Sequence, residues 1–302
     1  MKVIFDMDPG IDDAIALLIA LNNPKLNVLA VTTVSGNVDV DKSTRNALRI
    51  IDAMGKNTVV ARGASKPLFK RAIHAEHVHG RDGLGNSNIP RPKSNPSKLG
   101  AQKLFQDLIK THKKKELSII ATAPLTNIAL LLDTEPSVAN RLDKIVLMGG
   151  VYGVAKNARG NITPFAEFNF YCDPEAANMV LSSGAKIEAS GLDVTMNPKC
   201  AVDKGALDTI RKLKGKAASI TSRILTYPIS RYKIFHLLDV FAVACLLQPK
   251  MFKIIDCMVR VDRFGKFRGR CVTTLKKGNV KVCSGVDQQK FVQFVLQGVR
   301  QH

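Results

Sequence analysis

The sequence predicts an α/β fold with an open, mostly parallel, Rossmann-like sheet flanked by helices. Short apolar segments alternate with helical ones along most of the chain, which is typical of strand–helix–strand units. The first of these segments, residues 3–5, is apolar throughout, as expected of a parallel strand that is buried on both faces. No linker stands out, so we expect residues 1–302 to form one domain.

The individual elements follow from this alternation in chain order. Strands are predicted at residues 3–5, 26–34, 59–61, 117–122, 144–148 and 186–189. Helices are predicted at residues 14–21, 42–54, 101–111, from about 127, and at 174–181. Residues 67–97 form a long segment rich in His, Gly, Pro and Asn, and such loops are usually functional or disordered.

The last third of the chain has a different pattern. It is mainly helical from about residue 203 to residue 247, which adds a helical region near the candidate site. Short strands alternate over residues 254–283, and a helix over 288–301 closes the chain. The sheet is therefore expected to be mostly, rather than entirely, parallel.

The composition is that of a globular protein, with 45% hydrophobic and 23% charged residues. No apolar run is long enough to span a bilayer, so no membrane partner is expected. The six cysteines form no Cys-x-x-Cys pair, which favours free thiols in a reducing cytosol and a cytoplasmic location.

The formal net charge of +20 raises the question of a nucleic-acid partner. Lysines are scattered, with only short clusters at residues 113–115 and 276–277. Aromatic residues make up 6% of the chain and tryptophan is absent, so there are few side chains on which bases could stack. We therefore expect a solvated basic surface and no nucleic-acid partner.

Four carboxylates gather at the first turn of the predicted sheet, at Asp6, Asp8, Asp12 and Asp13, and no Lys or Arg occurs from residue 3 to residue 24. Two carboxylates about 4 Å apart repel by roughly 4 kcal/mol at an effective dielectric near 20. Helix capping explains one or two of them but not four beside a Pro-Gly turn. All-oxygen donors at the carboxyl edge of a sheet favour Ca²⁺ or Mg²⁺ over zinc.

Further motifs follow this cluster, which itself reads DMDPGIDDA over residues 6–14. They are Ser35-Gly36-Asn37, residues 79–85 (HGRDGLG), 121–127 (ATAPLTN), 148–150 (MGG), 161–169 (NITPFAEFN) and 173–176 (DPEA). In sequence and order these motifs resemble the inosine–uridine preferring nucleoside hydrolase family. The resemblance extends along nearly the whole chain.

The resemblance implies a metal site and a sugar site. Ca²⁺ would be held by Asp8, Asp13, Asp239 and the backbone carbonyl of Thr122. The ribose hydroxyls would be bound by Asp12, Asn37, Asn161, Glu167 and Asn169. Each position also has a possible structural role, since Asn37 and Asn161 are typical turn residues, and Glu167 and Asn169 alternate as in an extended segment. The family resemblance further implies a homodimer or homotetramer.

The reaction implied is hydrolysis of the N-glycosidic bond of ribonucleosides to ribose and a free nucleobase. Asp8 and Asp12 are the catalytic candidates, with Asp8 taking the proton of a Ca²⁺-bound water. Ligation of the 2′- and 3′-hydroxyls would favour ribose over deoxyribose.

The sequence departs from the family at the position before Asp239. Family members often carry a histidine there, which is proposed to protonate the leaving base, whereas this chain has Leu238. Protonation by that route is therefore lost. Candidates for the base side and its loops are His79, Met148, Phe168, Tyr227, Tyr232 and His236. The sequence leaves open whether purines or pyrimidines are preferred.

Two other functions fit parts of the sequence. A Mg²⁺-dependent haloacid-dehalogenase-like phosphohydrolase also places Asp-x-Asp after an apolar strand, with Asp6 as the nucleophile, but its signature continues with Gly-Thr or Gly-Val. A non-catalytic nucleoside or nucleic-acid binder would suit Leu238 and the positive charge. The intact group of carboxylates argues against that second alternative.

Overall fold

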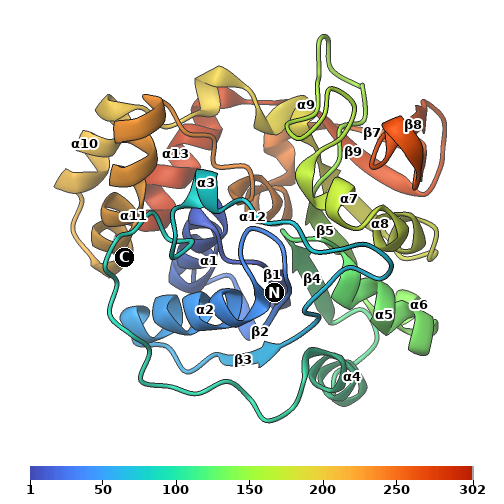
Figure 1. Cartoon of the computed structure of the whole chain (residues 1–302), viewed down its shortest axis with the longest axis horizontal. Coiled ribbons are helices and arrows are strands. Elements are labelled where there is room, and N and C mark those ends of the chain that lie inside the picture. Colours follow the sequence, from blue (N-terminus) through green and yellow to red (C-terminus); the bar gives the residue numbers. More distant parts are fainter. Residues whose placement is uncertain (301–302) are drawn as a thin grey trace.

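The sheet has nine strands, in the spatial order β3-β2-β1-β4-β5-β6-β9-β7-β8, in a computed structural model that describes residues 1–300 (Figure 1). The strands are β1 (Lys2–Met7), β2 (Asn27–Thr33), β3 (Val59–Arg62), β4 (Leu117–Ala121), β5 (Ile145–Met148), β6 (Ile187–Ser190), β7 (Phe252–Val261), β8 (Cys271–Thr274) and β9 (Val280–Val286). The pairs from β3 through β9 are parallel, and only the pairs made by β7 are antiparallel. The prediction of a mostly parallel α/β sheet is confirmed.

Helices cover both faces of this sheet. They are α1 (Ile11–Asn22), α2 (Val40–Met54), α3 (Glu76–His79), α4 (Ala101–Thr111), α5 (Thr126–Thr134), α6 (Val138–Arg141), α7 (Phe168–Cys172), α8 (Pro174–Leu181), α9 (Leu192–Thr195), α10 (Lys204–Lys212), α11 (Lys216–Tyr232), α12 (Val240–Leu247) and α13 (Gln288–Val299). None of these helices of residues 1–300 has the length and hydropathy needed to cross a membrane.

Side chains along β1 point alternately into two hydrophobic cores, one on each face of the sheet. Val3, Phe5 and Met7 face a core that also contains α1, α11, α12 and α13. Ile4 faces the opposite core, which includes α4, α5 and α8. Successive side chains of a strand point to opposite faces, so an apolar run such as residues 3–5 serves both cores.

The order in which successive strands are added to the sheet reverses at β1. Strands β2 and β3 extend from β1 to one side, and β4, β5 and β6 extend to the other. A parallel sheet leaves a crevice at the carboxyl ends of its strands where the strand order reverses, and ligands of open α/β folds bind there. The loops after β1 and β4 are therefore the expected place for a site.

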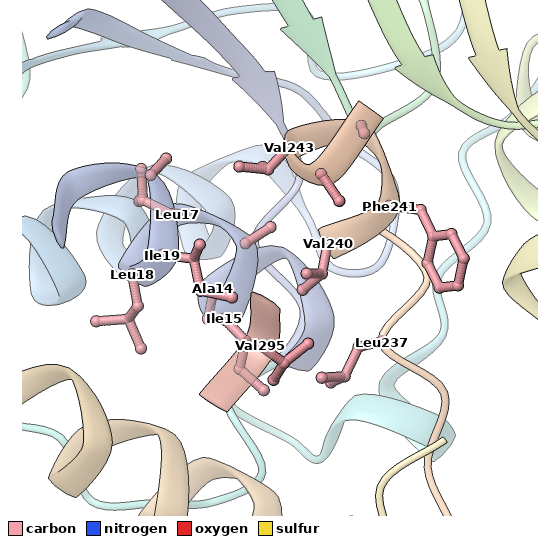
Figure 2. Close-up of a cluster of buried hydrophobic side chains, with 14 of the residues drawn as sticks. Ala14, Ile15, Leu17, Leu18, Ile19, Leu237, Val240, Phe241, Val243 and Val295 are labelled. Carbon is pink, nitrogen blue, oxygen red and sulfur yellow. The ribbon is translucent and has the colours of Figure 1, made fainter. Parts of the chain in front are cut away.

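Helix α1 is buried from Ile11 to Leu21 because other helices cover the side that faces away from the sheet. Figure 2 shows Ala14 and Ile15 of α1 near Val240 of α12 and Val295 of α13, in one hydrophobic cluster. In that same cluster the rings of Phe241 and Phe291 stack with centroids 4.0 Å apart. This packing fixes the amino-terminal end of α12 beside the first turn of α1, although more than 200 residues separate them in the chain.

Several predicted boundaries differ from the structure. The predicted loop over residues 67–97 contains the short helix α3, and the predicted strands in residues 254–283 include one long strand, β7. The segment around Phe168, expected to be extended, begins helix α7. The last helix ends at Val299, and its predicted end at residue 301 lies outside the described residues.

Candidate active site

A cavity of about 740 Å³ opens at the carboxyl ends of β1, β4 and β5. Its walls come from the turns after these strands, from the segment around α3, and from the ends of α7, α11 and α12. The predicted metal and sugar residues that line it are Asp12, Asn37, Thr122, Asn161, Glu167, Asn169 and Asp239. Residues predicted from separate motifs thus meet in one place.

The carboxylates of this site come from three elements. Asp8 follows β1, Asp12 and Asp13 lie in the first turn of α1, and Asp239 is the residue that precedes α12. Oxygen atoms of Asp12, Asp13 and Asp239 lie within 4.8 Å of one another, and all three residues are buried. The Asp239 side chain makes no capping hydrogen bond to its own helix, so its carboxylate is available to this group.

Asp13 is held in place by three donors. The backbone N–H of Gly10 and the side-chain amide of Asn37 donate to Oδ2 at 3.1 and 3.0 Å, and the Thr122 hydroxyl donates to Oδ1 at 2.7 Å. The first of these bonds also caps α1, which explains why this helix begins at Ile11, three residues before the predicted start. The same carboxylate therefore starts the helix and faces the site.

Asp8 lies outside the group of three but has an oxygen free to join it. Its Oδ2 accepts a hydrogen bond from the backbone N–H of Asn37, whereas its buried Oδ1 has no partner within residues 1–300. A Cβ atom at Gly36 would overlap the Asp8 carboxylate, so this turn requires glycine. Asp12 Oδ1 is buried without a partner as well. Buried oxygens of this kind are the donors that hard divalent cations prefer.

The electrostatics of the cluster favour binding of a cation. Burial, and after it the neighbouring Asp13, raises the pKa of Asp12 to about 7. Burial also raises the pKa values of Asp8 and Asp239 well above their ordinary range, with further increases from the other carboxylates. Without a cation, the group keeps protons that isolated aspartates would lose near pH 4. The residues therefore fit a divalent ion.

The sugar residues lie beside this cluster. Glu167 caps α7 and accepts hydrogen bonds from the backbone N–H groups of Gly150 (2.9 Å), Asn169 (2.8 Å) and Phe170 (3.1 Å). The Asn169 amide donates to the carbonyl oxygen of Thr122 at 3.0 Å. Asn161 accepts from the N–H of Phe168 at 2.9 Å. The cap at Glu167 explains why the segment turns into a helix instead of remaining extended.

His79 belongs to the short helix α3 and closes one side of the site. Its Nδ1 accepts a hydrogen bond from the backbone N–H of Ile11 at 3.0 Å. Burial, followed by the charge of His77, lowers the pKa of His79 to about 3. The ring is therefore neutral at pH 7 with its proton on Nε2, so it can donate a hydrogen bond but is not an imidazolium acid.

The base-side candidates divide into two groups. Met148, Phe168, Tyr232 and His236 line the cavity, whereas Tyr227 does not and packs instead against the core. The Tyr232 hydroxyl donates to the carbonyl oxygen of His77 at 2.8 Å, which ties α11 to the segment around α3.

Leu238 lines the cavity at the position where family members often have a histidine. Lining residues that sequence analysis did not single out are His74 and a mostly apolar or aromatic set: Ile73, Ala75, Val78, Ile162, Tyr171, Ile234 and Phe235. Tyr171 follows Phe168 by three residues on α7, so the two side chains lie on the same face of this helix. Sequence analysis expected an extended segment here and therefore did not predict Tyr171 as a site residue.

Asp6 is separated from this site. It is fully buried, and its Oδ1 accepts hydrogen bonds from Thr32 (2.6 Å) and Asn127 (2.8 Å). It does not line the cavity. A phosphohydrolase nucleophile has to reach its substrate, so this position of Asp6 argues against the haloacid-dehalogenase-like alternative.

Comparison with known proteins agrees with this geometry. The family model for the inosine-uridine preferring nucleoside hydrolases matches residues 3–293. The chain belongs to this family. It is therefore a ribonucleoside hydrolase, an enzyme that cleaves N-glycosidic bonds, and the non-catalytic alternative is set aside.

Similar proteins of this nucleoside hydrolase family have different base preferences. The pyrimidine-specific ribonucleoside hydrolase RihA of Shewanella sp. (strain MR-7) is 37% identical over 97% of this chain and 94% of its own. The pyrimidine-specific ribonucleoside hydrolase RihA of Citrobacter koseri is 36% identical over 98% of this chain and 97% of its own. The structure of the purine-preferring ribonucleoside hydrolase from Gardnerella vaginalis superposes with a TM-score of 0.92 at 29% identity, covering 99% of this chain and 98% of the other.

Proposed function

We propose that this enzyme hydrolyses ribonucleosides with Ca²⁺ held by Asp8, Asp13, Asp239 and the carbonyl oxygen of Thr122. The observation that carries the proposal is the buried group of carboxylates within 4.8 Å, together with the unpartnered oxygens of Asp8 and Asp12. Every donor is an oxygen atom, and Ca²⁺ accepts six to eight of them. A bound Ca²⁺ would offset the negative charge and lower the pKa of a water molecule.

Asp8 and Asp12 are the proposed catalytic residues. The backbone N–H of Asn37 orients the Asp8 carboxylate through Oδ2, and the unpartnered Oδ1 would hold the ion. The same carboxylate would take a proton from the attacking water. Asp12 lines the cavity and would contact the sugar. The reaction adds water across the bond: the hydroxyl goes to C1′ of the ribose and the proton goes to the departing base.

The sugar is proposed to be bound by Asn37, Asn161, Glu167 and Asn169 in addition to Asp12. Bond cleavage develops positive charge on the ribose. Asp12 and Glu167 are buried carboxylates in the wall of the cavity, where a negative charge stabilises that developing charge more than it would in water. Backbone donors hold Glu167 fixed, so little reorganisation is needed in the transition state.

Departure of the base must proceed without a histidine at position 238. We propose that His79 or His236 donates a hydrogen bond to the base and that Tyr232 packs beside it, since all three line the cavity. The variants His79→Ala, His236→Ala and Tyr232→Ala are compared on a substrate with a poor leaving base, with Tyr227→Ala as the control outside the cavity. If all three retain full kcat, none of these side chains assists the base.

The decisive test is a panel of the common ribonucleosides, assayed for released reducing sugar before and after chelation. Release of ribose, loss of activity with chelator and recovery with Ca²⁺ are expected. The panel includes purines and pyrimidines because relatives of both preferences are similar to this chain. Full activity in the presence of chelator would contradict the proposed role of the metal.

Two further proposals concern assembly and location. We propose a homodimer or homotetramer, which light scattering on the purified enzyme would test. We also propose a cytoplasmic location, since the cysteines are free and five of the six are buried, as expected of thiols that carry no structural disulfide. Fractionation of the producing cells would test that location.

A further inference from the structure

A second cavity, of about 390 Å³, lies between helix α2 and the glycine-rich loop that follows α3. Figure 1 shows this segment leaving α3 and passing the end of α2. Helix α2 contributes Lys42, Arg45, Asn46 and Arg49 to the wall, and the loop contributes Arg81, Asp82, Asn86 and Asn88. Four basic side chains thus face a single carboxylate among the described lining residues.

The arginines of this cavity lack counter-charges. Lys42 pairs with Glu76 at 2.6 Å and with Asp39 at 3.4 Å. By contrast, the guanidinium groups of Arg45, Arg49 and Arg81 make no ion pair or hydrogen bond within residues 1–300, and the Nε atom of Arg49 is buried without a partner. Arg45 and Arg49 are four residues apart on one face of α2, where like charges repel. The fold therefore maintains an uncompensated positive site.

The walls of the cavity are held in place by other contacts. Asp82 accepts hydrogen bonds from the backbone N–H groups of Leu84 and Asn86 at 2.8 and 2.9 Å, so its carboxylate is used inside the loop. Arg223 of α11 donates to the carbonyl oxygens of Ser87 and Asn88 at 2.8 and 2.6 Å. Asn86 and Asn88 adopt positive φ values of 48° and 53°, a backbone state often found where loops contact ligands.

This cavity is also linked to the active site. The Asn46 amide donates both to the carbonyl oxygen of Asp82 (2.7 Å) and to that of Pro9 (3.2 Å), which lies within the acidic turn. His79, at the start of the glycine-rich loop, accepts from Ile11 in the same turn. A ligand that bridges α2 and the loop would therefore fix a segment that forms one wall of the active site.

We propose that this cavity binds a phosphate group. Guanidinium groups are planar forks of donors that match phosphate oxygens, and three of them converge here with the amides of Asn86 and Asn88. The phosphate could be inorganic, or it could be part of a sugar phosphate or a nucleoside monophosphate. The volume, close to 390 Å³, leaves space beyond one phosphate.

The test is calorimetric titration of the full chain at constant ionic strength with inorganic phosphate, ribose 5-phosphate and a nucleoside monophosphate. At least one is expected to bind with a dissociation constant below about 1 mM. Arg49→Gln should weaken binding at least tenfold. Arg81→Gln should do the same, and because its side chain is exposed this variant is expected to fold normally. Arg91→Gln removes the same charge from an exposed residue outside the cavity and should change binding less than twofold.

The position of the bound phosphate is determined by hydrogen exchange, measured on the same samples. Bound phosphate should protect the backbone amides of residues 80–88, and Arg49→Gln should remove that protection. Equal weakening by Arg91→Gln, protection confined to other segments, or no binding by any of the three anions would overturn the proposal. Retention of an RNA oligomer without binding of the three anions would also overturn it, since that result indicates an extended surface for a phosphodiester backbone. None of these readouts requires hydrolase activity, so the test is independent of the proposed function.

Discussion

The lining of the active-site cavity has a polar part around Asp12 and Asp239, the polar end, and a mainly apolar part that includes Ile234 and Phe235, the apolar end. At the polar end, Asp13, Glu167 and Asn169 make hydrogen bonds that leave each side chain little freedom. The apolar end is built from the short helices α3 and α7, the end of α11 and the segment between α11 and α12. We propose from this difference that the polar end performs the chemistry common to all ribonucleosides and that the apolar end selects the base.

The largest expected effect is at the polar end, in the variant Asp13→Asn. The change removes one charge and one proposed ligand, and we expect kcat/KM to fall by about 10³-fold or more, equivalent to about 4 kcal/mol. An asparagine can still accept from Gly10 and Asn37, and its amide can donate to the Thr122 hydroxyl. The thermal midpoint should therefore be retained while steady-state kinetics show the loss.

Asp6→Asn is the matched control for that variant. Asp6 is equally buried on β1, but its Oδ1 bonds to Thr32 and Asn127, and it is outside the group formed by Asp12, Asp13 and Asp239. We expect its kcat/KM to remain within about tenfold of the parent, since it supplies no proposed ligand. Equal losses in Asp6→Asn and Asp13→Asn would remove the distinction between the metal site and buried carboxylates in general.

The sugar residues should show a smaller effect that depends on the substrate. Asn169→Ala removes an amide that faces the cavity and donates to Thr122, so kcat/KM on a ribonucleoside should fall roughly 10²-fold, with a smaller fall on the deoxyribonucleoside. Asn140→Ala, an exposed change on α6, serves as the control. An equal loss of kcat/KM on both substrates would show that Asn169 supports the fold and does not bind the 2′-hydroxyl of the ribose.

The acidic cluster also predicts how the stability of the metal-free enzyme depends on pH. Burial raises the pKa values of Asp6 and Asp12 to about 7 from 3.8, so the folded state binds more protons than the unfolded state between these values. Stability then falls as the pH rises from 4 to 7. His79 acts in the opposite sense, since its lowered pKa makes stability fall as the pH drops from 6.5 toward 3.

Several carboxylates have raised pKa values and only this one histidine opposes them, so the stability of the metal-free enzyme should decrease overall as the pH rises. We expect the thermal midpoint of the chelated enzyme to fall by roughly 5 °C or more from pH 5 to pH 8. Saturating Ca²⁺ should raise the midpoint most at pH 8. A midpoint that rises over this range in chelator would contradict the pKa assignments of the cluster.

The smallest expected effect is a gain at the apolar end, in the variant Leu238→His. Leu238 lines the cavity, so a histidine there could protonate a departing base. We expect about a tenfold rise in kcat on a poor leaving base, with a new dependence on a group that titrates near pH 6.5. Leu238→Met controls for the change of side chain, and a similar response in both variants would exclude proton donation.

The polar end could be predicted from sequence because strand ends determine it. Asp8, Asp12 and Asp13 are close in the chain, at the end of β1 and the start of α1, so their proximity follows from the sequence. Thr122 was assigned by the family resemblance and lies at the same edge because β4 pairs with β1. Asp239 needed the family resemblance, because only the packing of α12 on α1 brings it there.

The residues of the apolar end could not be predicted from the sequence, because helix geometry and contacts between distant segments determine their positions. Tyr227 and Tyr232 lie on the same helix but five residues apart, about 140° around its axis, so they cannot both face the cavity. Helix α7 has only five residues, and its start depends on the distant N–H of Gly150. Helix α3 has four residues and lies beside the Asn37 turn, whose carbonyl accepts from the N–H of Ala75. Such contacts leave no periodic signal in the sequence.

The central claim is that the buried carboxylates are a calcium site, and calorimetric titration of the chelated enzyme with Ca²⁺ tests it most directly. We expect one ion to bind per chain, with binding lost in Asp13→Asn and retained in Asp6→Asn. No binding by the parent enzyme, or equal binding by Asp13→Asn, would contradict the claim.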